Sequence, residues 1–311
     1  MSMEKNKQST AGFLALAAAA SIWGGLYVVS KVALDYIPPF TLLWIRYVIA
    51  FLCLWIMVAL QGLRQPITRD WRTFATIGFA GYFLSIGLQF IGTWLSSAHM
   101  GALLTSTSPA FIVLFAYLML GEKLTVRKLA SVACATCGVI IVVGWEGSGF
   151  SVKTVAGDLA LIGAAVSWAL LSVLARKASA SYPPLVITTY GIFWGCLLTT
   201  PAMLIEWQFL PVTGLDRPSL WLAILYISIV STAGAFYLWN KGMQLVEAGA
   251  GSVFFFFQPI VGALLGWLLL DEQLGLPFFI GGGMILLSIL AVSLPASAKN
   301  RSVEPKKGGS A

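Results

Sequence analysis

Long apolar stretches and short polar connections alternate along almost the whole chain. Each stretch is near the length that an α-helix needs to cross about 30 Å of hydrocarbon. The pattern therefore predicts an all-α integral membrane protein with ten transmembrane helices. The predicted spans are 11–33, 40–60, 72–95, 98–120, 126–145, 157–176, 184–207, 219–240, 248–270 and 277–295.

The two halves of the chain are related in sequence. Residues 12–39 match residues 157–184 at an offset of 145 positions, with Trp23 on Trp168, and the later spans match at an offset of 150. A duplicated unit with an odd number of spans forms an inverted repeat, which is typical of secondary transporters. We therefore expect two five-helix repeats of opposite orientation.

Composition supports a membrane location. Hydrophobic residues make up 59% of the 311 positions, charged residues 10%, and mean hydropathy is +0.88, whereas a soluble domain carries roughly 25% charged residues. The connections are short, so we expect no soluble domain. The expected organisation is a cytoplasmic N-terminal segment over 1–10, a first repeat over 11–145, an inverted second repeat over 157–295 and a disordered basic cytoplasmic tail over 296–311.

The distribution of Lys and Arg predicts the orientation. With alternating spans, 15 of the 19 fall on the side of the N-terminus and 3 on the other side, while Arg46 lies within the second span. Cytoplasmic loops carry this excess, so we expect a multi-pass protein of the bacterial inner (cytoplasmic) membrane with both termini cytoplasmic. The net charge of +7 then favours membrane lipids, not nucleic acid, as partners.

Small residues recur along the spans, as in the G-x-x-x-G pair Gly191/Gly195. Helices in lipid approach each other through such residues, and a homodimer contact through some of them stays open. Cys134 and Cys137 lie three positions apart within the fifth span. We interpret them as small buried residues at helix contacts and expect neither a metal nor a cofactor.

Pro109 and Pro259 lie about halfway along the fourth and ninth spans, at equivalent positions of the two repeats. A proline inside a helix removes one hydrogen bond, and a membrane helix tolerates this where other polar groups or a cavity satisfy the freed carbonyl. Thr105 and Ser106 precede the first proline and Gln258 precedes the second. Two interpretations stay open, a structural kink and a paired broken-helix substrate site near the midplane.

The order of short motifs resembles a known family. Each half opens with a Trp-containing helix that ends in a cation, and its fourth span ends in Leu-x-Glu-x-Leu, at 120–124 and 270–274. The segment around Arg46 adds to this likeness, and Gly191 replaces that arginine in the second half. Over roughly residues 10–295 the chain resembles the EamA family of the drug/metabolite transporter superfamily. The resemblance implies a ten-helix exporter or facilitator of metabolites, often amino acids, with a central cavity lined by spans one, three, four, six, eight and nine.

Two ion pairs between the halves follow from the predicted topology. Lys31 and Glu272 lie at the outer ends of spans one and nine, and Arg176 and Glu122 lie at the inner ends of spans six and four. We interpret both as gates that close alternately. The alternative is that each side chain is solvated independently at a membrane interface.

Arg46 has three interpretations. It extends outward to the interface, it pairs with Asp35, or its guanidinium binds a substrate carboxylate. The only histidine, His99, lies at the outer start of span four, and no acidic residue lies at mid-membrane. The sequence leaves proton coupling undetermined and leans toward facilitated diffusion.

Aromatic and amide residues in the cavity-lining spans predict a mostly apolar pocket with a few polar anchors. Such a pocket suits a neutral or zwitterionic, partly hydrophobic small-molecule substrate. The candidate substrate-binding residues are Trp23, Tyr27, Arg46, Tyr82, Gln89, Thr105, Ser106, Pro109, Trp168, Tyr237, Trp239, Asn240, Gln258 and Pro259. The predicted function is a secondary transporter acting by alternating access. An intramembrane enzyme, which the lack of H-E-x-x-H and G-x-S-x-G disfavours, and a membrane scaffold or sensor are the alternatives.

Overall fold

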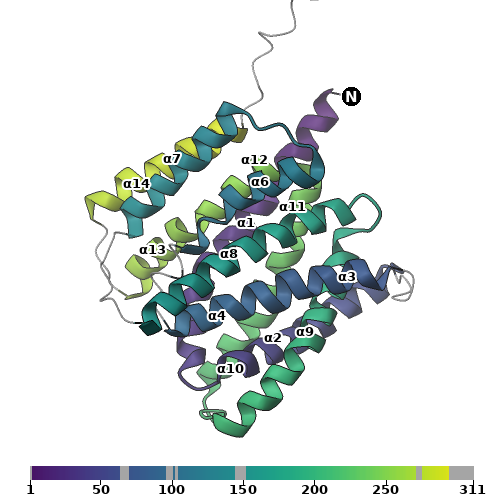
Figure 1. The fold of residues 1–311 in the computed structure, drawn as a ribbon, viewed down its shortest axis with the longest axis vertical. Coiled ribbons are helices and arrows are strands. Elements are labelled where there is room, and N and C mark those ends of the chain that lie inside the picture. Colours follow the sequence, from purple (N-terminus) through teal and green to yellow (C-terminus); the bar gives the residue numbers. More distant parts are fainter. Residues whose placement is uncertain are drawn as a thin grey trace, which may run out of the picture.

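The computed structural model describes residues 2–63, 70–95, 101, 104–143, 152–270 and 275–293, and the regular structure in these ranges is entirely helical (Figure 1). The elements are α1 (Ser2–Leu34), α2 (Pro39–Leu60), α3 (Trp71–Ile77), η1 (Gly78–Ser85), α4 (Ile86–Leu95), α6 (Ser108–Leu120), α7 (Val126–Val143), α8 (Val152–Ala178), α9 (Pro184–Phe209), α10 (Pro218–Leu225), η2 (Tyr226–Gly234), α11 (Ala235–Leu245), α12 (Ala248–Gly251), η3 (Ser252–Phe256), α13 (Phe257–Leu270) and α14 (Leu276–Ser293). Since α1 begins at Ser2, most of the segment expected before the first span is helical.

Six helical runs are long and apolar enough to cross a membrane, and they coincide with predicted spans one, two, three, six, seven and eight. They are Gln8–Leu26, Pro39–Leu60, Trp71–Leu95, Val155–Ala178, Pro184–Phe209 and Pro218–Leu245. Shorter apolar helices lie within predicted spans four, nine and ten. The chain is therefore an all-helical, multi-pass membrane protein, and the full count of ten stays a prediction. The predicted joint between spans three and four, His99 and the tail over 296–311 lie outside the described residues.

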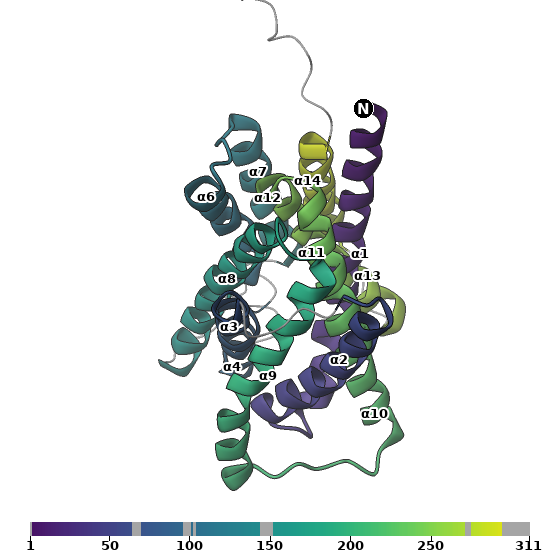
Figure 2. The same ribbon diagram turned by 90° about the vertical axis from the view of Figure 1, so that its right-hand side faces the viewer.

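The helices form one bundle in which segments distant in sequence lie side by side (Figure 2). Helix α1 packs against α11 and α13, α8 packs against α4 and α6, and α2 packs against α9. Helices α7 and α14 pair along one edge (Figure 1). The N-terminus of α1 lies at the top of Figure 1, together with α12, and we call this end of the bundle the N-terminal side.

Two close helix contacts occupy equivalent places in the halves. A Cβ on Gly242 of α11 would lie 2.5 Å from Cγ of Leu16 in α1, and one on Gly92 of α4 would lie 2.6 Å from Cγ of Leu161 in α8. Leu16 matches Leu161 at the offset of 145, and Gly92 matches Gly242 at the offset of 150. In both helix pairs, the absence of a side chain on glycine allows the close approach of the helices, as is common in membrane proteins.

These contacts predict the effect of adding a methyl group. Gly242→Ala and Gly92→Ala will lower the thermal unfolding midpoint in detergent, because overpacking a tight contact costs about 1–3 kcal/mol. Gly283→Ala in α14 is the matched control, since no described atom lies within 4 Å of its added Cβ. An equal effect of all three substitutions would contradict the proposed role of the close contacts.

Candidate substrate cavity and its closed end

Four predicted spans are interrupted, and residues within or directly beside each interruption line one cavity. Segments η1 and η2 are π-helical and break predicted spans three and eight. Segment η3 is a 3₁₀-helix that breaks span nine, and a turn at 106–107 breaks span four directly before α6. Pro109 and Pro259 therefore lie in the first turns of α6 and α13. Single π-turns within helices are frequent at functional sites.

Side chains from neighbouring helices bond to the backbone of both π-segments. The hydroxyl of Tyr47 donates to the carbonyl of Tyr82 in η1 at 2.5 Å, and the indole N–H of Trp23 donates to the carbonyl of Ser231 in η2 at 2.9 Å. These two carbonyls are 149 positions apart, close to the repeat offset. Irregular backbone within a membrane requires such partners, so the interruptions are built into both halves.

A cavity of about 30 Å³ lies where the interrupted segments meet. It is lined by Trp23, Leu26, Arg46, Ser85, Ile86, Gln89, Thr105, Ser108, Ala164, Ala165, Trp168, Phe236, Phe255 and Gln258. This volume suits one or two water molecules and is far below the roughly 300–1,000 Å³ of a typical ligand pocket. Binding of a metabolite therefore requires the lining helices to separate.

An aromatic cluster forms one wall of the cavity. The rings of Trp23 and Trp168, equivalent residues of the two halves, meet edge to face with centroids 5.1 Å apart. Phe236, Trp239 and Phe255 surround them, each within 6.2 Å of both tryptophans. Such pairs add about 0.5–1.5 kcal/mol each beyond the area that they bury, so the cluster holds α1, α8, α11 and η3 together.

Arg46 reaches the cavity from α2, a helix that the expected set of cavity-lining spans did not include. The residue is only 1% exposed. Its Nε donates to Oγ1 of Thr232 in η2 at 2.8 Å, and its guanidinium carbon lies 5.7–5.9 Å from the ring centroids of Tyr47, Phe90 and Phe236. Within the part of the chain that the structure describes, Nη1 and Nη2 have no hydrogen-bond partner.

This placement decides between the three interpretations of Arg46. The side chain is too buried to reach the interface, and the described acidic residues, Asp35 among them, form no ion pair with it. The first two interpretations are therefore wrong for this conformation. Only the substrate-binding interpretation remains as a prediction.

The other sequence candidates fall into three groups. Thr105, Gln89 and Gln258 line the cavity with both tryptophans. Tyr82, Ser106, Pro109, Trp239, Asn240 and Pro259 are buried without belonging to its lining, and Tyr237 is half-buried outside it. The side chain of Tyr27 lies outside the described residues.

A buried hydrogen-bond network supports the wall from behind. Asn240 Nδ2 donates to Oγ1 of Thr188 at 2.8 Å and lies 3.5 Å from the hydroxyl of Tyr82, and Trp239 Nε1 donates to Oγ of Ser172 at 3.2 Å. These residues hold α8, η1, α9 and α11 in register. Their contribution is to position the residues that face the cavity.

Sequence reasoning missed several lining residues, including Ser85, Ser108, Phe236 and Phe255. The spacing of Ser85 and Gln89, four positions apart on one helical face, was a usable signal. The expectation of buried cysteines was also wrong for Cys137, which is exposed. Among the described residues no group of three His, Cys, Asp or Glu side chains is placed to hold a metal ion.

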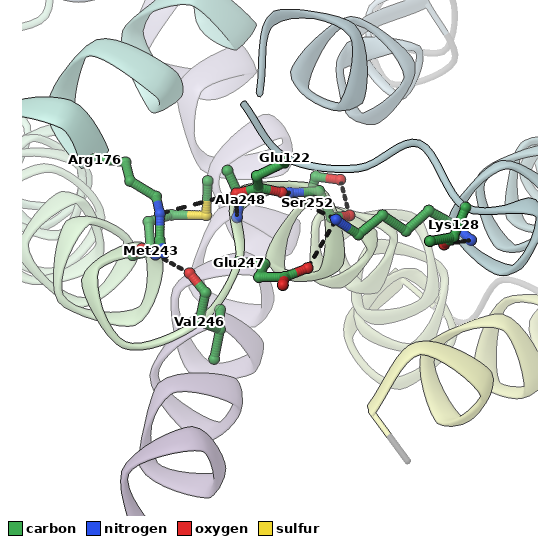
Figure 3. Close-up of polar contacts among 10 residues, drawn as sticks. Glu122, Lys128, Arg176, Met243, Val246, Glu247, Ala248 and Ser252 are labelled. Atoms are coloured by element: carbon green, nitrogen blue, oxygen red, sulfur yellow. Dashed lines mark hydrogen bonds and ion pairs between the residues drawn. The ribbon is translucent and has the colours of Figure 1, made fainter. Parts of the chain in front are cut away.

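A polar cluster around Glu122 joins the two halves at the N-terminal side of the bundle (Figure 3). Helix α6 ends at Leu120 because Gly121 adopts φ +67°, which turns the chain and brings Glu122 toward α12. Its carboxylate accepts hydrogen bonds from the backbone N–H groups of Ala248, at 2.7 Å, and Gly249, at 3.1 Å. A residue of the first half thus holds the first turn of a helix in the second half.

Cations complete this cluster from two directions. Lys128 Nζ lies 3.1 Å from Glu122 and 2.8 Å from Glu247. Arg176 Nε lies 4.0 Å from Glu122, and its Nη1 donates to the carbonyls of Met243 and Val246 at the end of α11 (Figure 3). The expected contact of Glu122 with Arg176 is present, but the closer partners are backbone amides and Lys128. The expected outer pair lies outside the description, because Glu272 and the side chain of Lys31 are not described.

A family model described as the EamA-like transporter family matches the chain twice, over residues 10–144 and 155–294. The chain belongs to the EamA-like transporter family. An uncharacterized transporter of Archaeoglobus fulgidus is 28% identical over 292 residues, which cover 93% of this chain and 98% of that protein. The uncharacterized transporter YetK of Bacillus subtilis is 28% identical over 283 residues, covering 88% and 84%.

One solved crystal structure superposes on this EamA-like protein with a TM-score of 0.77 at 24% identity, covering 91% of this chain and 96% of the other. This likeness shows the fold. The match of the family model to both halves identifies the chain as a membrane transporter.

The cluster at the N-terminal side predicts a change in accessibility. Ser252, fully buried behind the first turn of α12, is replaced by Cys in a variant lacking the four native cysteines. Adding Glu122→Gln will raise the rate at which maleimide modifies the cysteine at position 252 in detergent severalfold. The neutral amide cannot form the ion pair with Lys128 and presents only one acceptor oxygen to the two backbone N–H groups. Lys123→Gln, at the exposed neighbouring position, is the control and will leave the rate unchanged. Equal rates in both variants would show that Glu122 does not hold this end closed.

Proposed function

We propose that this chain is a secondary transporter that moves small metabolites such as amino acids across the cytoplasmic membrane by alternating access. The observation that carries the proposal is the cavity where interrupted spans of both halves meet, with the Glu122 cluster linking the two halves at one end of the bundle. Discontinuous helices around a central site are the usual construction of secondary transporters. The names of the relatives support the same class.

In this mechanism the Glu122 cluster is the gate on the N-terminal side. Opening it separates Glu122 from Ala248 and Gly249 of α12, and the N–H groups released at that helix start are then hydrated by entering water. The excess of Lys and Arg at this side supports a cytoplasmic location for this gate. Lys31 and Glu272, at the other end of the equivalent spans, are the proposed gate on the opposite side.

Filling the cavity tests whether it is the transport site. Counterflow is measured in proteoliposomes loaded with pooled amino acids and small metabolites. The unmodified protein will accumulate a labelled solute driven only by the counter-gradient of that solute. Ala165→Leu will abolish accumulation, because Ala165 lines a cavity of about 30 Å³ and the larger side chain occupies it.

Ala156→Leu, at an exposed position of the same helix, is the matched control and will transport normally. Gel filtration and thermal unfolding will establish that both variants are folded. Normal counterflow with a filled cavity would place the transport site elsewhere. Chemical conversion of a pooled metabolite without counterflow would favour the enzyme alternative.

A further inference from the structure

Arg46 lines the cavity, and the Nη1–Nη2 edge of its guanidinium has no hydrogen-bond partner among the described residues. Thr232 fixes Nε through a 2.8 Å hydrogen bond, and the rings of Tyr47, Phe90 and Phe236 hold the rest of the group. Nη1 and Nη2 are buried and have no partner within the described residues. A buried, unpaired charge is costly, so a ligand that fills this edge gains more than the same contact would yield in water.

The geometry of that edge selects a planar acceptor. Two parallel N–H donors match the two oxygens of a carboxylate, which binds such a fork in a bidentate manner. Of the described side chains that line the cavity, Arg46 is the charged one. One cation balances one negative charge, so a dianion such as a phosphate monoester would leave one charge uncompensated in a low-dielectric site.

The remaining lining defines the rest of the ligand. Trp23, Trp168, Phe236 and Phe255 form an apolar wall. No acidic side chain stands among the described lining residues to balance an ammonium group. Recognition therefore rests on the carboxylate and on apolar contact, and an ammonium group would leave one positive charge uncompensated in the site.

We infer that the cavity binds small apolar monocarboxylates through Nη1 and Nη2 of Arg46, with recognition of the carboxylate and not of an amino group. This rests on the proposed transport function for its biological meaning, but binding itself is measured without transport. The inference narrows the substrate class from metabolites in general to carboxylates, with amino acids bound through that same group.

The experiment is thermal unfolding of the purified full-length protein in detergent with three probes of one carbon skeleton: leucine, 4-methylpentanoate and 3-methylbutylamine. A ligand that binds the folded state raises the unfolding temperature according to its concentration and affinity. 4-Methylpentanoate will stabilise the protein at the lowest concentration, leucine will require a higher one because its ammonium group has no counter-charge in the site, and the amine will not stabilise it. Stabilisation by the amine alone, or by none of the three probes, would overturn the inference.

Arg46→Met separates a binding role from a structural one. Because the variant no longer buries an unpaired charge, it will unfold without ligand at the same temperature as the unmodified protein or at a higher one. The carboxylate concentration needed for half-maximal stabilisation will rise about ten- to hundredfold, as expected for lost bonds to a charged group. Arg72→Met, at an exposed arginine, changes the same charge and will keep the response to carboxylates.

Two results would overturn the role of Arg46. A lower unfolding temperature of Arg46→Met without ligand would assign the residue to packing. Arg46→Lys, which keeps the charge but loses the fork, will also respond weakly, and an unchanged response would show that no bidentate contact is made. Counterflow with the same probes is scored separately, so carboxylate binding without exchange would contradict the transport function alone.

Discussion

A polypeptide inside hydrocarbon has to satisfy its own backbone hydrogen bonds, and this requirement decides where the bundle can be irregular. The regular helices need no help from their neighbours. The π-segments η1 and η2 receive it from Tyr47 and Trp23. At the turn before α6, the hydroxyls of Thr107 and Ser108 donate to the carbonyls of Leu104 and Thr105. Because polar side chains have to gather where the backbone is irregular, the same place becomes the cavity.

The same constraint explains the closed end. The break between α11 and α12 exposes two kinds of backbone group side by side, the carbonyls that end one helix and the N–H groups that begin the next. Arg176 binds the carbonyls and Glu122 binds the N–H groups. Each charge also agrees in sign with the dipole of the helix end that it meets. Arg176 and Glu122 lie close together because they bind the two sides of the same helix break.

A similar arrangement holds α2 at the opposite end of the bundle. Glu206, near the end of α9, accepts hydrogen bonds from the backbone N–H groups of Phe40 and Thr41 at 3.1 and 2.7 Å. Pro39 begins α2 and has no N–H of its own to satisfy. Carboxylates thus fix helix starts at both ends of the bundle, and each comes from the other half of the chain.

Much of this architecture could be predicted from local patterns, because hydrocarbon thickness sets helix length and duplication sets equivalent positions. The meeting of Trp23 with Trp168 follows from the duplication. Which face of a helix is directed to the cavity after a π-segment does not follow from the duplication. One extra residue in a helical turn rotates every later side chain around the helix axis. Tyr237 was therefore expected at the cavity, whereas Phe236 lines it. Lys128 was missed because its contact with Glu122 depends on the turn at Gly121.

The departure from symmetry at Arg46 carries the most information about the ligand. At the offset of 145 its equivalent is Gly191, and a Cβ there would lie 2.6 Å from the ring of Tyr82. Packing of η1 against α9 therefore excludes a second arginine. Two equivalent cations would suit a dianion, whereas one cation against a shared aromatic wall suits a monoanion with an apolar body. The inferred preference of the cavity for a monoanion thus rests on Arg46, at a position where packing leaves the second half no room for an equivalent arginine.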